Sequence, residues 1–255
     1  NNNFDPLRRQ VLIGSAVALA SASLLSLSPI SLAAEMPLPD YGNWKTPEAL
    51  IVHSANTLET KRDAIGTSII TSNEQLFIRN NLPPPPPSIM LNREAWTVAF
   101  QGVKNPRSMT LGELKTLGVT TVASVLQCSG NGRAFFDHES SGTQWTTGAA
   151  GRVLWSGVPL KAVVEALGGN LEGLPYITST GAEELPAGLD PKSLMVERSV
   201  PLQALDQAIL AWELNGEPLS LAHGGPLRLV VPGYYGVNNI KYVKQVAFTA
   251  AQTDA

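Results

Sequence analysis

Apolar and polar positions along the chain are spaced in a way that predicts several short strands. Apolar residues alternate with polar ones in "AWTVAFQGV" (95–103), and β-branched residues fill "VTTVASVLQC" (119–128). Both patterns are typical of strands. Asn215 and Gly216 separate two apolar runs and predict a hairpin turn. The further strands expected are 208–214 and 217–221 on either side of this turn, 226–232, and 240–248.

Helical spacing of apolar residues occurs in two short segments. The segment "SMTLGELKTLG" (108–118) has Ser108 or Thr110 as its N-cap and ends at a glycine. The segment "SGVPLKAVVEALGG" (156–169) has Pro159 in its first turn and also ends at glycines. Helices this few and this short do not suit a regular doubly wound sheet, so the pattern predicts an α+β fold with mixed sheets.

The region 35–87 lacks either periodicity and is expected to be irregular. It is polar for most of its length and ends in five consecutive prolines, 83–87, which can form only an extended segment without backbone hydrogen-bond donors. A segment of this kind is held by contacts with the rest of the protein.

The first residues of the chain have the outline of an export signal. Arg8 and Arg9 precede an uncharged run rich in serine and alanine that reaches Ala34, which predicts a twin-arginine signal peptide over 1–34. An uncleaved membrane anchor is the alternative, although the serines and the proline in the run are poor residues to face lipid. We therefore expect a periplasmic or otherwise exported protein with no stable membrane span after cleavage, and one domain over 35–255.

Composition narrows the possible partners. Hydrophobic residues make up 44% of the chain and the formal net charge is −3, with no run of basic residues. This balance is that of a globular protein without the basic patch that nucleic-acid binding requires, so no nucleic-acid partner is expected.

The chain has one cysteine, Cys128, at the end of a predicted strand and at the start of the turn "SGNG". A single cysteine cannot form an intramolecular disulfide, so in an exported protein this thiol is expected to be either buried and inert or bound to a ligand. Gly130 and Gly132 allow a tight turn that presents backbone amides, and Arg133 adds a positive charge. Positive surroundings favour the thiolate, which is the form that binds metals.

Other known binding or catalytic motifs are matched by this turn only in part. "GNGRAF" has Phe135 where a dinucleotide-binding fingerprint needs its third glycine. A cysteine hydrolase would need a histidine base, and His138 leaves that alternative open. The chain has no CxxC, HExxH, GxSxG or Walker A motif, and with three histidines zinc is not expected.

Taken together, "LFIRNN", "LQCSGNGR", "WSGVPL", "LAWELNG" and "HGGPLRLVVPGYYGVNNIKYV" resemble the molybdopterin-binding domain of the sulfite oxidase family, nearest to the bacterial sulfite dehydrogenases. The resemblance covers Pro47 to Phe248, with the motifs in matching order. It implies a mixed-sheet molybdopterin-binding domain over 35–255. The chain ends before the segment with the family's active-site tyrosine and before its β-sandwich dimerisation domain, so that C-terminal domain is expected to be absent from this sequence.

The resemblance also implies roles for individual residues. Cys128 is the thiolate ligand of molybdenum, which suits a soft metal that changes oxidation state, and Arg79 and Arg133 are the catalytic residues that contact the substrate. Vertebrate members have histidine where Asn81 stands. The residues implied to bind the cofactor, Mo-molybdopterin, are Phe77, Ile78, Arg79, Asn80, Asn81, Glu183, His223, Arg228, Asn239, Ile240 and Lys241. The residues interpreted as structural are His53, Trp145, Trp155, Trp212 and Tyr242.

The function that the resemblance implies is an exported, molybdenum-dependent oxidation of sulfite or a related sulfur oxyanion. The chain shows no haem domain, so an external carrier, a c-type cytochrome by family analogy, is expected to accept the electrons. Two alternatives stay open. One keeps the cofactor and changes the substrate, as in a sulfur dehydrogenase or a sulfoxide reductase. The other is an exported protein that uses the scaffold, without catalysis, to bind an anion or a partner.

Overall fold

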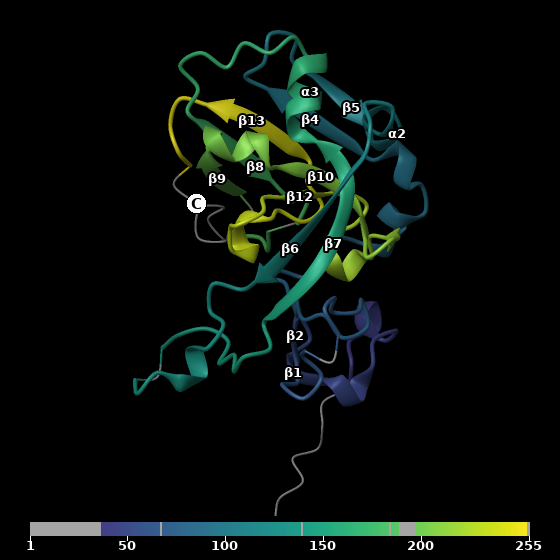
Figure 1. Cartoon of the computed structure of the whole chain (residues 1–255), viewed down its shortest axis with the longest axis vertical. Coiled ribbons are helices and arrows are strands. Elements are labelled where there is room, and N and C mark those ends of the chain that lie inside the picture. Colours follow the sequence, from purple (N-terminus) through teal and green to yellow (C-terminus); the bar gives the residue numbers. More distant parts are fainter. Residues whose placement is uncertain (1–36, 67, 139, 184, 189–196, 254–255) are drawn as a thin grey trace, which may run out of the picture. The chain divides into compact units, whose positions relative to one another are not determined.

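The computed structural model describes residues 37–255, except for residues 67, 139, 184, 189–196 and 254–255 (Figure 1). The predicted signal peptide, 1–34, lies outside the described residues. Three sheets and few helices make up the described part, which confirms the predicted α+β class with mixed sheets. None of the helices within these residues combines the length and apolar character needed to cross a bilayer.

The first sheet has the order β1-β2-β3, with β1 at Leu50–Ser54, β2 at Thr57–Thr60 and β3 at Ile78–Arg79. All its pairings are antiparallel. The prediction that 35–87 is irregular was therefore wrong for these strands. In β2 every residue is buried, including the polar Thr57, Glu59 and Thr60, so no alternation of apolar and polar residues marks the strand in the sequence.

The second sheet has the order β11-β10-β7-β6, and β12 also pairs with β10. The bounds are Thr120–Gln127 for β6, Ala150–Pro159 for β7, Ile209–Leu214 for β10, Glu217–Pro218 for β11 and Arg228–Val230 for β12. The β10–β11 hairpin is confirmed: Asn215 and Gly216 have φ of 54° and 82°, the left-handed values that this turn requires. The long connection from β6 to β7 extends away from the sheet (Figure 1).

The third sheet has the order β5-β4-β13-β8-β9. The bounds are Thr97–Gln101 for β4, Arg107–Thr110 for β5, Tyr176–Thr180 for β8, Glu197–Pro201 for β9 and Gln245–Thr249 for β13. The β4–β13 pair is parallel and the other pairs are antiparallel. The strand predicted at 240–248 begins later than expected, at Gln245, and residues 240–244 lie outside it.

Of the two N-cap candidates predicted for the first helix, Thr110 is confirmed, and the second helix begins directly after Pro159. Residues 107–110 pair with β4, so Ser108 lies in a strand and α2 spans Leu111–Lys115, with Thr110 and Glu113 forming a capping box. Residues 156–159 belong to β7, so α3 spans Leu160–Ala166 with Pro159 as its N-cap. Short 3-10 helices lie at Asp40–Gly42, Pro47–Ala49, Pro87–Met90, Arg93–Ala95, Arg133–Phe135, Leu202–Asp206, Leu221–His223 and Gly236–Asn238.

Two apolar clusters support the cavity described below. The larger one includes Trp96, Phe100 and Tyr242 and joins the third sheet to both α-helices and to one face of β10. The second is built around Phe77, Trp145, Trp155 and the other face of β10. Phe77 and Trp145 belong to this second cluster and also line the cavity, so the floor of the candidate site is part of a packed core.

Candidate functional site

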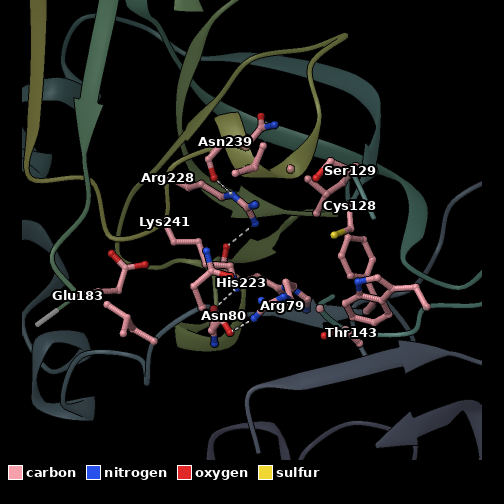
Figure 2. Close-up of a pocket in the computed structure, with 18 of the residues that line it drawn as sticks. Arg79, Asn80, Cys128, Ser129, Thr143, Glu183, His223, Arg228, Asn239 and Lys241 are labelled. Carbon is pink, nitrogen blue, oxygen red and sulfur yellow. Dashed lines mark hydrogen bonds between the residues drawn. The ribbon is translucent and has the colours of Figure 1, made fainter. Parts of the chain in front are cut away.

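A cavity of about 240 Å³ lies among the ends of β3, β6 and β12 and the loops that follow them. Figure 2 shows Cys128 and Ser129 on one side of it and Glu183 on the other. The lining residues are Phe77, Arg79, Asn80, Asn81, Leu82, Leu126, Cys128, Ser129, Arg133, Gly142, Thr143, Trp145, Glu183, His223, Arg228, Gly236, Val237, Asn239 and Lys241.

The structure brings together almost all residues that the sequence singled out for the site. Ile78 and Ile240 are the exceptions, because their side chains pack in the hydrophobic core and do not line the cavity. Any contact between these two residues and a bound group has to go through their backbone atoms. The assigned role of each remaining residue stays a prediction.

Cys128 is the first residue after β6, and its backbone is fixed on both sides. Its amide donates to the carbonyl of Ala149 at 2.9 Å, and its carbonyl accepts from the amide of Asn131 at 3.0 Å. The side chain of Asn131 accepts from the amide of Ala149, which ties the turn back to the start of β7. The thiol therefore has a defined position on the cavity wall while staying half-buried.

Arg133 reaches the same cavity from the short 3-10 helix that follows the turn. Its Nη1 donates to the carbonyl of Thr143 at 2.9 Å. Gly132, with φ of 89°, lets the chain change direction directly before it. One carbonyl acceptor leaves other donors of the guanidinium fork available for an anion.

Arg79 approaches from β3 in the first sheet. Its Nη1 donates to the backbone carbonyl of Asn80. Burial lowers the pKa of Arg79, the nearby Cys128 raises it, and the positive charge of Arg133 lowers it further. Arg79 lies in the first sheet and Arg133 in the connection between β6 and β7, and the two are close enough to repel each other, so an anion between them would relieve that repulsion.

Two more cations, the buried Arg228 and the half-buried Lys241, lie in the wall of the cavity (Figure 2). Arg228 donates to the carbonyls of His223 and Asn239, and Lys241 donates to the side chain of Asn80 and the carbonyl of Ala222. Within the part of the chain that the structure describes, neither forms an ion pair with a carboxylate.

The pKa values of these groups reflect an excess of buried positive charge. Burial lowers the pKa of Arg228 to about 10. Burial and the repulsion of Arg228 lower the pKa of Lys241 well below its ordinary value. Burial, with Lys45, Lys241 and Arg228 nearby, lowers the pKa of His223 well below its ordinary value. The carboxyl of Glu183 is also buried, and burial raises its pKa. The charge of Glu183 opposes part of the shift at Arg228 and Lys241, but burial and repulsion outweigh it. Buried cations without a full counter-charge are costly, so this wall is suited to an anionic occupant.

Four buried polar atoms on the cavity wall have no hydrogen-bond partner within the part of the chain that the structure describes. They are Nδ2 of Asn80, Nε1 of Trp145, Oε2 of Glu183 and Nε2 of His223. Buried polar groups are almost always paired in native proteins, and unpaired ones call for an explanation. An occupant that offers both donors and acceptors along its length would satisfy all four.

Some lining residues could not be found by sequence reasoning. Trp145 was interpreted as packing, and it is fully buried in the core yet also lines the cavity. Thr143 contributes through its backbone carbonyl, which no side-chain pattern reveals. His138 is exposed, stacks on Phe136 and does not line the cavity with Cys128, so the described structure gives a cysteine hydrolase no base there. The described residues contain no cluster of three or more His, Cys, Asp or Glu that could hold a metal.

The chain is similar to known proteins of one oxidoreductase family. Residues 84–255, more than half of the chain, match the family described as "Oxidoreductase molybdopterin binding domain". Mitochondrial sulfite oxidase of Drosophila melanogaster is 32% identical over 191 residues, covering 72% of this chain. Sulfite oxidase of Arabidopsis thaliana is 30% identical over 208 residues (76%), and inducible nitrate reductase [NADH] 1 of Glycine max is 31% identical over 193 residues (73%).

The matched region is only part of each of these relatives. It covers 32% of the Drosophila protein, 51% of the Arabidopsis protein and 21% of the Glycine protein, so the chain spans about half of their length or less. Among solved structures, the sulfane dehydrogenase SoxCD of Paracoccus pantotrophus superposes with a TM-score of 0.66, at 24% identity, over 80% of this chain and 50% of that one. That likeness shows a shared fold.

Proposed function

Because this chain belongs to the family of oxidoreductase molybdopterin-binding domains, we propose that it is an exported enzyme that oxidises sulfite or a related sulfur oxyanion. The observation that carries the proposal is the cavity in which one thiol comes together with two arginines, one from the first sheet and one from the connection between β6 and β7. A thiol can bind a soft metal, and two guanidinium groups can bind an oxyanion.

The residues of the cavity fit a molybdopterin cofactor. Its phosphate suits Arg228 and Lys241, which form no ion pair with a carboxylate among the described residues, and its pterin ring offers donors and acceptors to the unpaired atoms of Asn80, Glu183 and His223. Cys128 would bind the metal as a thiolate. When bound, the cofactor supplies a metal that accepts two electrons and takes part in oxygen-atom transfer.

The protein's own contribution to the reaction is to bind and orient the anion. Arg133 and Arg79 neutralise the charge of the substrate, and a planar guanidinium fork fixes the orientation of a pyramidal oxyanion. Trp145 and Phe77 form an apolar floor that limits water around the bound anion and so strengthens these charge interactions. Oriented binding of this kind lowers the barrier without any proton transfer from a side chain.

Oxidation of sulfite to sulfate adds an oxygen from water and releases two protons and two electrons. The electrons need an acceptor, for which we propose an external carrier of the c-type cytochrome class. The paired Arg8 and Arg9 support export through the twin-arginine route to the periplasm. That route carries folded proteins, which suits an enzyme that has bound its cofactor before export.

A second substrate class is supported by one observation. The nitrate reductase of Glycine max is nearly as similar to this chain as the two sulfite oxidases are. The same cavity would then reduce an oxyanion or a sulfoxide, or oxidise a protein-bound sulfur as a sulfur dehydrogenase. In all these cases the cofactor and the role of Cys128 stay the same, and only the residues around the anion decide the substrate.

The test is a substrate comparison on the full-length protein expressed with cofactor synthesis intact. Molybdenum content is measured first, and then steady-state turnover with sulfite, nitrate and a sulfoxide. We expect molybdenum to be present and kcat/KM to be highest for sulfite. Preference for nitrate or the sulfoxide would support the second class, and a protein without molybdenum would be a non-catalytic binding protein.

A variant pair tests the proposed oxyanion residue in the same assay. Arg133→Gln should lower kcat/KM for sulfite by about ten- to a hundredfold, because charge-assisted hydrogen bonds contribute roughly 1.5–3 kcal/mol each. Arg133→Lys should recover part of the loss, and molybdenum content should stay the same in both. Arg152 is exposed in β7 and does not line the cavity, so Arg152→Gln is the matched control. A loss of less than twofold for Arg133→Gln would remove Arg133 from the anion site.

A further inference from the structure

Glu59 is a fully buried carboxylate in β2 that the proposed function does not use. One of its oxygens, Oε1, accepts three hydrogen bonds from one loop: from the amide and the hydroxyl of Thr146 and from the amide of Gly148, with both amide distances at 2.9 Å. The other oxygen, Oε2, lies 2.7 Å from Nε2 of His53. One side chain therefore fastens the loop to the first sheet.

The backbone also runs close to β2 at this point. The amide of Thr60 donates to the carbonyl of Gly148, and a β-carbon at Gly148 would lie 1.7 Å from the carbonyl oxygen of Thr60. Burial would raise the pKa of Glu59, but the hydrogen bonds from Thr146, Gly148 and His53 outweigh it and hold the pKa below its ordinary value. The carboxylate is thus charged, and the contact with the loop is charge-assisted.

The fastened loop is the one that holds Arg133. Besides the bond from its Nη1 to Thr143, the amides of Gly132 and Ala134 on either side of Arg133 donate to the carbonyls of Thr146 and Trp145 at 2.7 and 3.0 Å. Both the backbone around Arg133 and its guanidinium therefore depend on the segment 143–146.

The sheet to which the loop is fastened is the one that holds Arg79. β2 pairs with β3, and Thr57 stands opposite Arg79 in the register of that pair. Glu59 lies two residues further along the same strand. A chain of contacts therefore leads from Arg79 through β2 and Glu59 to the loop, and from the loop to Arg133.

We propose that Glu59 is a positioning residue for the anion site, which sets the distance between the guanidinium groups of Arg79 and Arg133. It does not touch the substrate, because it does not line the cavity. The inference rests on the proposed function only in that both arginines bind one anion. Misplacing one of them by a fraction of an ångström weakens that binding without removing any donor.

Glu59→Gln in the full-length, molybdenum-loaded protein tests the proposal, because it keeps the shape and removes the charge. We expect KM for sulfite to rise about tenfold with kcat within about twofold, since binding geometry is lost and no reacting group is. Molybdenum content should be unchanged. Independently of activity, amide hydrogen exchange in a peptide covering 141–149 should become faster, because the amides of Thr146 and Gly148 lose a charged acceptor.

Glu197→Gln is the matched control. Glu197 is likewise a hydrogen-bonded carboxylate in a strand, although it is half-buried, and its Oε2 accepts from the hydroxyl of Thr180. It does not line the cavity or contact the loop. Glu197→Gln should lower stability and leave KM and the exchange of 141–149 unchanged. If Glu59→Gln behaves like Glu197→Gln, with lower stability and unchanged KM, then Glu59 is structural only and the proposal is wrong.

A gentler variant covers the case in which Glu59→Gln does not fold. Thr146→Val removes one of the three donors to Oε1 and should raise KM in the same direction by a smaller factor, about two- to fourfold. An unchanged KM in a folded Thr146→Val protein would overturn the proposal. If the parent does not oxidise sulfite, the proposed function fails by itself, and sulfate affinity then replaces KM. A parent that also fails to bind sulfate would overturn the positioning role as well.

Discussion

The guanidinium of Arg133 lies directly against the backbone of Gly130, so that a β-carbon on Gly130 would come within 2.6 Å of both of its terminal nitrogens. The absence of a side chain at this position is therefore part of the binding site. It leaves room for Arg133 to reach the cavity beside the thiol of Cys128, five residues earlier in the chain.

Gly130→Ala should weaken substrate binding with little effect on stability. The atoms that the new methyl group would meet are the end of a flexible side chain, which can move away without disturbing the backbone. We expect KM for sulfite to rise by about tenfold, because the displaced fork no longer orients the anion. Gly112→Ala in α2 meets no atom closer than 3.6 Å and serves as the control. Equal KM values in the two variants would show that Arg133 does not act from this position.

Cys128→Ser should leave a folded protein that lacks oxidase activity. The thiol is half-buried at the end of β6 and its backbone bonds do not involve the sulfur, so the loss of stability should be small. A neutral hydroxyl is a poor substitute for a thiolate on a soft metal. Pterin fluorescence, molybdenum content and sulfite oxidation are measured together. Substantial sulfite oxidation by the serine variant would contradict the ligand assignment and favour an inert buried cysteine.

Lys241→Met should reduce the amount of cofactor that remains bound after purification. Lys241 forms no ion pair with a carboxylate among the described residues. An anionic group of the cofactor is therefore its expected counter-charge. Loss of one charge-assisted hydrogen bond of roughly 1.5–3 kcal/mol corresponds to about ten- to a hundredfold weaker binding. Lys244→Met is the control, because Lys244 lies over the ring of Trp96 and does not line the cavity. Equal pterin contents in the two variants would argue against a cofactor contact.

The cofactor-free protein should become more stable as the pH rises above 7. Burial lowers the pKa of Lys45 from 10.5 to about 7. Between these two values the unfolded chain binds a proton that the folded chain has released, so the free energy of unfolding rises with pH by up to roughly 1.4 kcal/mol per pH unit. Urea unfolding from pH 7 to 9 measures the slope, which Lys45→Met should reduce.

The control for this slope is Lys161→Met. Lys161 is exposed and pairs with Asp206 at the surface, so its removal should leave the rise between pH 7 and 9 in place. Comparing each variant with the parent separates Lys45 from other groups whose pKa is shifted by burial, such as Lys241. Parallel slopes for the parent and Lys45→Met would mean that Lys45 is not the source of the pH dependence.

The sequence predicted those parts of the fold in which the local residue pattern alone determines the secondary structure. β6 is marked by its β-branched residues, and the β10–β11 hairpin by Asn215 and Gly216. The start of α2 was marked by Thr110, whereas the start of α3 was less clear because β7 runs directly into this helix. Pro159 is compatible with a first helical turn, but pairing of 156–159 with β10 holds it as the N-cap of α3. Tertiary pairing decided the boundary there, and local propensity could not reveal it.

The same distinction applies to the site. Residues in distinctive motifs, such as Cys128 and Arg133, lie together in the cavity, and the charged side chain of Arg228 also lines it, while the role of each residue stays a prediction. Glu59 was missed because "TLETK" looks like an ordinary polar surface segment, and only the three-dimensional fold buries it beneath Thr146. A buried carboxylate whose partners are about ninety residues away leaves no local signal in the sequence.

The wall of the cavity is assembled from segments that are far apart in the chain, at Arg79, Cys128, Glu183 and the region from His223 to Lys241. No single strand or hairpin contains enough of it to hold a cofactor, and closing the long loops between these segments is a late event in folding. A molecule can therefore bind the cofactor only when all three sheets have come together. The cofactor content of a preparation then measures the fraction of completely folded molecules. By linkage, the bound group in turn stabilises only the finished fold.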